Sequence, residues 1–252
     1  MSGDDTPVLE TTALSKSFGG LAAVRDVSIA LRRGELHALI GPNGAGKSTL
    51  VNLLSGELRP TSGEILLDGR PLDSTSAPRM AQAGVARSFQ RTNIFPPLSI
   101  LENVRLAAQA IHTPARELLR PRSAACDLDA RVTAVLERIG LHEASDRIAG
   151  TLSHGEQRLI EIAMALAGNP RVLLLDEPLA GMGNEEGEAM AHLLMGLARD
   201  HAVLLIEHDM DFVFSVADRM TVMVEGSLLA SGAPRDIRAD AAVQRAYLGA
   251  AS

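Results

Sequence analysis

The sequence predicts an α/β fold that combines a parallel β-sheet with an antiparallel β lobe near the N-terminus and an inserted helical lobe. Two uninterrupted apolar runs, Val172 to Leu175 and Ala202 to Ile206, are typical of strands that are covered on both faces. Segments with the helical spacing of apolar residues alternate with these runs, as they do around a parallel sheet. Between Asn93 and Ile162, helical segments and prolines occur without a strand pattern, which predicts the helical lobe.

In the first part of the chain, three short segments predict strands and one predicts a helix. The alternation of apolar and polar residues from Val27 to Leu31 predicts one half-buried antiparallel strand. The apolar run from Leu36 to Ile40 predicts a buried strand, and a helical segment from Thr49 to Ser55 follows it. Glu64 to Leu67 predicts a strand that enters a hairpin turn at Asp68-Gly69.

In the second part of the chain, periodic apolar residues predict helices around Val132 to Ile139 and Met190 to Leu197. A second hairpin is predicted at Glu225-Gly226. A short helix from Ala241 to Leu248 is predicted to finish the chain. We found no internal repeat and no low-complexity tract, so none of these elements belongs to a repeat array.

The length of 252 residues fits one large domain with a sizeable core. We predict a single domain over residues 8–252. Its core and β lobe are predicted to take residues 8–92 and 163–252, and the inserted helical lobe residues 93–162.

The composition excludes several classes of protein. Apolar residues make up 46% of the chain and charged residues 22%, which argues against intrinsic disorder. No run of about 18 apolar residues predicts a membrane-spanning helix, and the acidic first residues lack the apolar region of a secretory signal. A formal net charge of −7 and only 2% aromatic residues argue against nucleic acid as a partner. The single Cys126 excludes an internal disulfide and fits a reducing cytoplasm.

A glycine-rich segment between a predicted strand and a predicted helix matches the phosphate-binding pattern G-x-x-x-x-G-K-[ST]. Its backbone N–H groups and the N-terminus of the helix would converge on phosphate oxygens. Lys47 would reach the β- and γ-phosphates of a nucleotide, and the Ser48 hydroxyl would bind Mg²⁺. Lys47 is one of two lysines in a chain whose other basic residues are arginines. The residues of this predicted P-loop are Gly41, Pro42, Asn43, Gly44, Ala45, Gly46, Lys47, Ser48 and Thr49.

Two carboxylates, Asp176 and Glu177, end the apolar run that begins at Val172. Ligands of open α/β sheets bind at the C-terminal ends of the strands, which is where this pair stands. Asp176 suits a Mg²⁺ ligand, and Glu177 suits a general base that polarises the attacking water. Taken alone, the pair is equally typical of a solvated strand end. Together with the P-loop it predicts nucleotide hydrolysis.

The segment Leu152-Ser-His-Gly-Glu-Gln-Arg158, just before an apolar helix, resembles the LSGGQ signature of ATP-binding-cassette (ABC) ATPases. The other elements of that family follow in its order, so the resemblance covers essentially the whole chain. It implies that Phe18 stacks on adenine, that Gln90 binds Mg²⁺ and senses the attacking water, and that His208 contacts the γ-phosphate. Considered alone, Phe18 is more typical of a core side chain and His208 of the first turn of a helix.

The signature departs from the family pattern at two positions. His154 and Glu156 stand where the family has Gly and Gln. Ser153 and Gly155, which the resemblance places on the γ-phosphate, are retained, so we expect function to survive; alone, Ser153 is equally typical of a helix N-cap. Gly183 replaces the aspartate that is common in the following D-loop, which puts the usual contact between subunits in doubt.

Five segments narrow the resemblance to the ATPase subunits of branched-chain amino acid importers. It implies two cofactors, ATP and Mg²⁺, and a second cassette ATPase as partner in a homo- or heterodimer. It further implies two membrane permeases, a periplasmic binding protein, and a peripheral position on the cytoplasmic face of the inner (plasma) membrane. The segments are Phe18-Gly-Gly-Leu-Ala-Ala-Val24, Gly84-Val-Ala-Arg-Ser-Phe-Gln-Arg91, Glu177-Pro-Leu-Ala-Gly-Met182, Ile206-Glu-His-Asp-Met210 and Ala246-Tyr-Leu-Gly249.

The sequence therefore predicts an ATPase that powers the uptake of branched-chain amino acids or of a related small polar solute. Three alternatives stay open: the ATPase of a urea or amide importer, the ATPase of an exporter, and a soluble cassette protein that acts on nucleic acid or ribosomes. The last class usually has two cassettes in one chain or long coiled-coil insertions, and this sequence has neither.

Overall fold

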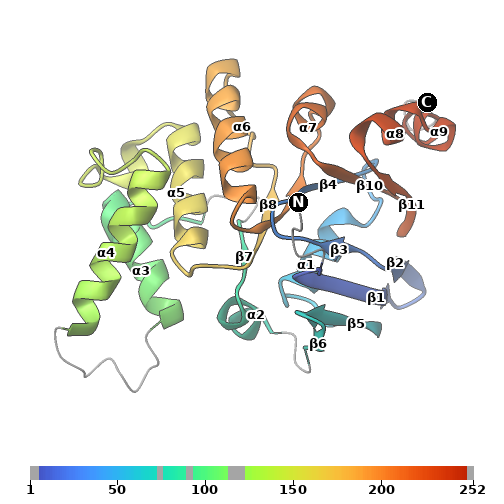
Figure 1. Ribbon diagram of the computed structural model, residues 1–252, viewed down its shortest axis with the longest axis horizontal. Helices are drawn as coiled ribbons and strands as arrows, with labels where there is room; N and C mark the ends of the chain where they lie inside the picture. Colours follow the sequence, from blue (N-terminus) through green and yellow to red (C-terminus); the bar gives the residue numbers. More distant parts are fainter. Residues whose placement is uncertain (1–5, 73–75, 89–92, 113–122, 249–252) are drawn as a thin grey trace.

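The computed structural model describes residues 6–72, 76–88, 93–112 and 123–248, and the fold is described for these residues (Figure 1). They form two β-sheets, with helices on both faces of the larger one. The predicted α/β class, with a mostly parallel sheet and an antiparallel lobe, is confirmed. No helix in the described part of the chain is long and apolar enough to cross a membrane.

Within the described residues, the larger sheet has six strands in the order β11-β10-β4-β9-β8-β7. Its strands are parallel except for β11, which returns antiparallel to β10 through the predicted turn at Glu225-Gly226. All residues of β4, β8 and β9 are buried, so the three predicted buried strands are confirmed. The strands are β4 (Leu36–Ile40), β7 (Val85–Arg87), β8 (Val172–Asp176), β9 (Ala202–Ile206), β10 (Arg219–Val224) and β11 (Ser227–Gly232).

The smaller sheet is antiparallel in all the pairings described. The predicted hairpin at Asp68-Gly69 is confirmed: both residues have positive φ, 48° and 69°, which is the geometry that Asp-Gly turns favour. Five strands form this sheet in the described part of the chain: β1 (Leu9–Phe18), β2 (Leu21–Val27), β3 (Ala30–Leu31), β5 (Ser62–Leu67) and β6 (Arg70–Pro71).

The prediction of one continuous strand from Val27 to Leu31 is wrong. The chain is in β2 up to Val27 and in β3 from Ala30, and the two strands pair with different parts of β1. The interruption has a side-chain cause: the Thr11 hydroxyl donates to the carbonyl of Val27 at 2.9 Å and accepts from the N–H of Ile29 at 3.0 Å. Backbone groups that a continuous ladder would pair are therefore taken by a side chain.

The predicted helices are confirmed with shifted ends, since the first begins at Lys47 and the one around Val132 ends at Arg138. Strands β1 and β7, strand β2 before Val27, and helices α2, α7 and α8 were not predicted. The helices are α1 (Lys47–Leu54), α2 (Ala77–Ala83), α3 (Ile100–His112), α4 (Ser123–Arg138), α5 (His154–Leu166), α6 (Asn184–Ala198), α7 (Met210–Val216), α8 (Pro234–Ala239) and α9 (Ala241–Leu248), with a 3₁₀ turn at Ala149–Thr151.

The core is divided by the larger sheet. On one face, Leu174 and Leu204 pack in the same cluster as α1 and the smaller sheet. On the other face, Leu173 and Leu205 pack with α3, α4, α5 and α6, and the first three of these helices lie together at one end of the molecule (Figure 1). In the described part of residues 93–162 there is one isolated β-bridge and no strand. The boundaries of the domain and of its helical lobe stay predictions.

Candidate functional site

The P-loop connects β4 to α1 and is shaped by glycines whose backbone no other residue could easily adopt. Gly46 caps α1 with φ 98°. A Cβ atom at Gly46 would overlap the carbonyl oxygen of Ala23 in β2, so a glycine is required both by conformation and by close approach. The loop is thereby fixed against the smaller sheet at the point where α1 begins.

Lys47 is buried inside this loop, with 7% of its surface exposed. Its Nζ donates to the carbonyl oxygens of Gly41 at 2.6 Å and Pro42 at 3.0 Å. Burial lowers the pKa of the Lys47 ammonium below its ordinary value, while the carboxylates of Glu177 and Asp176 oppose this shift. The one cation of the P-loop therefore points into its centre and faces two acids.

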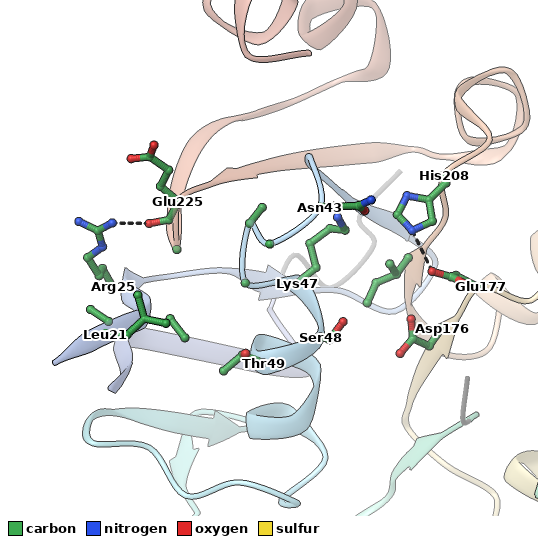
Figure 2. Close-up of a pocket in the computed structure, with 17 residues that line it drawn as sticks. Leu21, Arg25, Asn43, Lys47, Ser48, Thr49, Asp176, Glu177, His208 and Glu225 are labelled. Atoms are coloured by element: carbon green, nitrogen blue, oxygen red, sulfur yellow. Dashed lines mark hydrogen bonds and ion pairs between the residues drawn. The ribbon is translucent and has the colours of Figure 1, made fainter. Parts of the chain in front are cut away.

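A cavity of about 560 Å³ lies beside the P-loop. Figure 2 shows Lys47, Ser48 and Thr49 at the start of α1, with Asp176, Glu177 and His208 across the cavity. The structure thus brings together the predicted loop, the acid pair and the histidine from three separate parts of the sequence. The cavity is lined by Leu21, Ala22, Ala23, Arg25, Asn43, Gly44, Ala45, Gly46, Lys47, Ser48, Thr49, Asp176, Glu177, Ile206, His208, Glu225 and Gly226.

Glu177 lines this cavity with a constrained backbone. Its φ is +50°, in the left-handed region that non-glycine residues seldom adopt. Its N–H donates to the carbonyl of Ile206 at 2.9 Å, and His208 Nε2 donates to its Oε1 at 2.8 Å. The contact joins the end of β8 to the segment after β9, and it holds the carboxylate at the edge of the cavity (Figure 2).

Asp176 is held from the side away from the cavity. Arg87 Nη2 donates to its Oδ2 at 3.1 Å, and its backbone N–H donates to the Ser88 hydroxyl at 3.2 Å. The same guanidinium also donates to Asn52 Oδ1 of α1 at 2.5 Å. Arg87 therefore ties the acid at the end of β8 to the helix that begins with the P-loop.

Glu207, beside His208, is a buried carboxylate that bridges two loops. It accepts hydrogen bonds from the N–H of Leu179 at 2.8 Å and from the N–H of His208 at 3.1 Å. Burial raises the pKa of Glu207, and the two backbone donors oppose that shift. The loops that carry Glu177 and His208 are thus joined a second time through this side chain.

The predicted signature residues lie outside the cavity. Ser153 is the N-cap of α5, and its hydroxyl accepts from the N–H of Glu156 at 3.2 Å while Glu156 Oε2 accepts from the N–H of Ser153 at 2.9 Å. The glutamate that departs from the family pattern therefore completes a capping box. Gly155 is buried, and the Glu186 carboxylate lies close to the place that a Cβ atom would take. Both predicted roles stay predictions.

Phe18 is not among the residues that line the cavity. Phe18, at the end of β1, is 48% exposed, and its ring lies 5.2 Å from Lys16 Nζ. Leu21, its partner across the β1–β2 pairing, lines the cavity and is 69% exposed. Gln90 falls outside the described residues, so its predicted contacts with Mg²⁺ and water stay predictions.

Several residues of the site were not predicted from the sequence. Arg25 and Glu225 line the cavity, and Arg25 Nη2 donates to the backbone carbonyl of Glu225 at 2.6 Å (Figure 2). Neither position has a signal in the local sequence, because they are 200 residues apart. Arg87 and Glu207 each lie inside a segment that carries the family resemblance, but nothing in the local sequence indicates their contacts.

A scan against protein families matches residues 24–180 to the ABC transporter family and residues 227–252 to the family of branched-chain amino acid ATP-binding cassette transporters. Among curated proteins, the chain is 41% identical to the high-affinity branched-chain amino acid transport ATP-binding protein LivG of Salmonella typhimurium (strain LT2), over 97% of this chain and 99% of that protein. It is 40% identical to BraF of Pseudomonas aeruginosa, which carries the same description, with the same coverage.

Solved structures agree with these sequence matches. The ADP conformation of an ATP-binding cassette of an ABC transporter superposes with a TM-score of 0.84 at 28% identity, covering 96% of this chain and 99% of the other. A dimeric bacterial ABC transporter cassette gives 0.76 at 25% identity, covering 90% of this chain and 99% of that chain. The fold, the arrangement of P-loop and acid pair, and these matches lead to one conclusion: the chain belongs to the ABC transporter family and is one of its ATP-hydrolysing cassettes.

Proposed function

We propose that the chain is the ATP-hydrolysing subunit of an importer of branched-chain amino acids. One observation supports the proposed ATP hydrolysis best: Lys47 and the hydrogen-bonded pair of Glu177 and His208 line the same cavity. The cargo is supported by relatives of 40–41% identity that are named for branched-chain amino acid transport and match over nearly their whole length. The family match over residues 227–252 supports the same cargo.

In this proposal the buried side of the cavity binds the triphosphate. The backbone N–H groups of the P-loop and the N-terminus of α1 take the phosphate oxygens, and Lys47 exchanges its carbonyl partners for the β- and γ-phosphates. Leu21 offers an apolar surface at the outer end of the cavity, where the base of the nucleotide would lie, and Phe18 stands beside it as the predicted stacking ring.

Hydrolysis in this proposal depends on Glu177. Its carboxylate accepts a proton from the attacking water, and His208 holds the carboxylate in place from the other side. Bound Mg²⁺ would supply charge neutralisation of the phosphates. The Ser48 hydroxyl and the Asp176 carboxylate line the cavity and are oxygen donors of the kind that Mg²⁺ prefers, with substrate phosphates and Gln90 completing its ligands.

The chain would work as one of two cassettes, in a homo- or heterodimer. Ser153 and Gly155 lie outside the cavity of their own chain, and Ser153 is exposed, so its side of the helix start is available for the nucleotide bound by the other cassette. The two permeases would contact the helical end of the molecule on the cytoplasmic face of the membrane. There Phe95 is half exposed, and a mostly apolar cavity of about 360 Å³ lies between α2 and α5.

The decisive experiment is Glu177→Gln in the assembled transporter, with ATP hydrolysis and retained nucleotide measured together. The amide keeps the shape of the carboxylate but cannot accept a proton, so turnover should fall by about 10²–10⁴ while ATP stays bound in a closed dimer. Asp176→Asn should instead weaken Mg²⁺ binding and fail before closure. Hydrolysis by Glu177→Gln near the normal rate would assign the general base elsewhere, most directly to His208.

The cargo is tested separately, in vesicles that contain the transporter and its binding protein. We expect ATP-dependent uptake of leucine, isoleucine and valine. Uptake of urea or amides in their place would favour the urea or amide importer, and would leave the ATPase mechanism untouched.

A further inference from the structure

Helix α5 contains a buried ion pair that the catalytic scheme above does not use. Arg158 Nη1 donates to Glu161 Oε2 at 2.5 Å, one turn further along the helix, and the two side chains are only 6% and 3% exposed. Removing two charges from water is unfavourable unless their remaining polar atoms are also hydrogen-bonded. The further partners of this pair therefore show what it holds in place.

On one side, Arg158 holds the turn that carries Glu177. Its Nη2 donates to the backbone carbonyl of Glu177 at 2.9 Å and to that of Asp176 at 3.2 Å. Glu177 has a φ of +50°, a conformation that persists in a non-glycine residue only where its surroundings impose it. A charged donor on its carbonyl oxygen is such a constraint.

On the other side, Glu161 holds the segment that follows Gln90 in the sequence. Its Oε1 accepts from the N–H of Asn93 at 2.6 Å. Glu161, Asn93 and Ser88 line the same cavity of about 360 Å³ between α2 and α5, and Ser88 also accepts from the N–H of Asp176. The ion pair thus spans from the wall of that cavity to the backbone of the acid pair.

We propose that Arg158 is a positioning residue for hydrolysis, anchored by Glu161: it holds the backbone of Glu177 so that the carboxylate stays beside His208 and over the phosphate site. This inference rests on the proposed role of Glu177 as general base. The positioning depends on the guanidinium group, which donates to a carboxylate and to two carbonyl oxygens at once. A lysine ammonium has a shorter reach and does not make all three contacts.

The test is Arg158→Lys in the assembled transporter, with kcat, KM and ATP binding measured separately. Lysine preserves the charge opposite Glu161 but loses the donation to the two carbonyls. We expect kcat to fall about 10- to 100-fold, since small misplacements of a catalytic group have effects of that size, and the Kd of ATP to stay within about twofold. A parallel loss of kcat, ATP affinity and melting temperature would indicate a structural role and overturn the inference.

Arg138→Lys is the matched control. Arg138 also bridges a carboxylate and a carbonyl, Asp200 Oδ2 at 2.7 Å and the oxygen of Gly196 at 3.2 Å, but it lies outside the ATP cavity and on the surface. Its kcat should match that of the unmodified protein. If Arg158→Lys folds poorly, the double variant Arg158→Met with Glu161→Leu replaces the pair without leaving a buried charge, and the same loss of kcat is expected.

A variant series with Glu177→Gln separates this inference from the proposed function. If Arg158 acts through Glu177, Arg158→Lys should not lower the residual single-turnover rate of Glu177→Gln any further. A further drop of about 10-fold in that background would overturn the inference. Normal hydrolysis by Glu177→Gln would overturn the proposed base itself. A dead Glu177→Gln beside a fully active Arg158→Lys would overturn the positioning role alone.

Discussion

Lys47 is preorganised for anion binding by the backbone that surrounds it. Two carbonyl oxygens of its own loop hold its Nζ at 2.6 and 3.0 Å, and the side chain is almost wholly buried. These contacts fix the ammonium before a phosphate is present, so little side-chain entropy remains to be lost on binding. The lowered pKa of Lys47 shows the unfavourable side of the same burial, which a bound triphosphate would offset.

Lys47→Ala is expected to abolish nucleotide binding or turnover, because the β- and γ-phosphates lose the P-loop cation. Lys47→Arg should also fail, since the planar guanidinium cannot occupy a site shaped around a compact ammonium. ATP binding by titration and hydrolysis by the assembled transporter are the two measurements. Normal ATPase activity in either variant would refute the P-loop assignment, provided that circular dichroism shows both to be folded.

Leu21 lines the outer end of the nucleotide cavity, whereas Phe18, its partner across the β1–β2 pairing, does not line it. We expect Phe18→Ala to raise the KM for ATP and to leave turnover at saturating ATP nearly unchanged, because stacking on the base is remote from the phosphates. Leu21→Ala should raise KM in the same way. The comparison decides between them: an unchanged KM in Phe18→Ala and a raised KM in Leu21→Ala would assign base contact to Leu21.

At the scale of elements, the N-terminus of α5 has two roles, one in helix stability and one in the proposed binding of nucleotide. Its capping box, formed by Ser153 and Glu156, satisfies backbone N–H groups of the first turn, and Arg147 binds Glu156 Oε1 at 2.6 Å. The N–H groups that remain and the helix dipole form the surface that the other cassette's nucleotide is proposed to meet. The glutamate in place of the usual signature glutamine therefore stabilises the helix start without occupying that surface.

Ser153→Ala should lower the free energy of unfolding by about 0.5–2 kcal/mol through loss of the cap.

The contribution of Glu156 to stability should depend on pH. The backbone N–H of Ser153 lowers the pKa of Glu156 below its ordinary value of 4.5, so this stabilisation is complete above that pH and is lost as the pH falls below it. Denaturant titrations between pH 3 and pH 7 measure this, and Glu156→Gln should lack that part of the acid dependence. An identical acid dependence in Glu156→Gln would exclude the capping carboxylate as its source.

The D-loop shows another substitution that the structure compensates locally. Gly183 begins α6 without a capping side chain, and Glu186 accepts from its N–H at 3.0 Å instead. The same carboxylate lies against Gly155 of the signature. Helices α5 and α6 therefore meet at their N-termini through Glu186, so the loss of an aspartate at position 183 leaves the start of α6 with an acidic cap.

At the scale of the whole molecule, the ATP site of one chain is open. The cavity is bounded by the P-loop, the ends of β8 and β9, and the outer turn at Glu225, and no residue of the signature lines it. Solved cassettes of this fold include dimers. We therefore expect the purified chain alone to be a monomer and a poor ATPase, because in the proposed dimer half of each site would come from another subunit.

Size-exclusion chromatography with light scattering, with and without ATP, measures this expectation directly. A monomer without nucleotide, and dimers that accumulate only when Glu177→Gln binds ATP, would agree with it. A stable nucleotide-free dimer, or full hydrolysis at concentrations where the chain is monomeric, would contradict it.

The sequence by itself determined the elements whose chemistry is local. The buried strands follow from uninterrupted apolar runs, the turns from Asp68-Gly69 and Glu225-Gly226, and the P-loop from glycines at positions where the backbone has a positive φ. The acid pair was found because it ends an apolar strand, and parallel strands present their C-terminal ends at one edge. The histidine was found only through the resemblance of the sequence to a family.

The tertiary structure alone decided which groups hold these residues. The hydroxyl of Thr11 interrupts a strand 16 residues away, Arg87 binds Asp176 across 89 positions, and Arg158 binds a turn that lies 19 residues further on. Such contacts depend on how sheets and helices pack, and no local pattern of apolar residues encodes the partner of a buried charge. The sequence therefore predicted which groups react, and the packing of distant segments determined their positions.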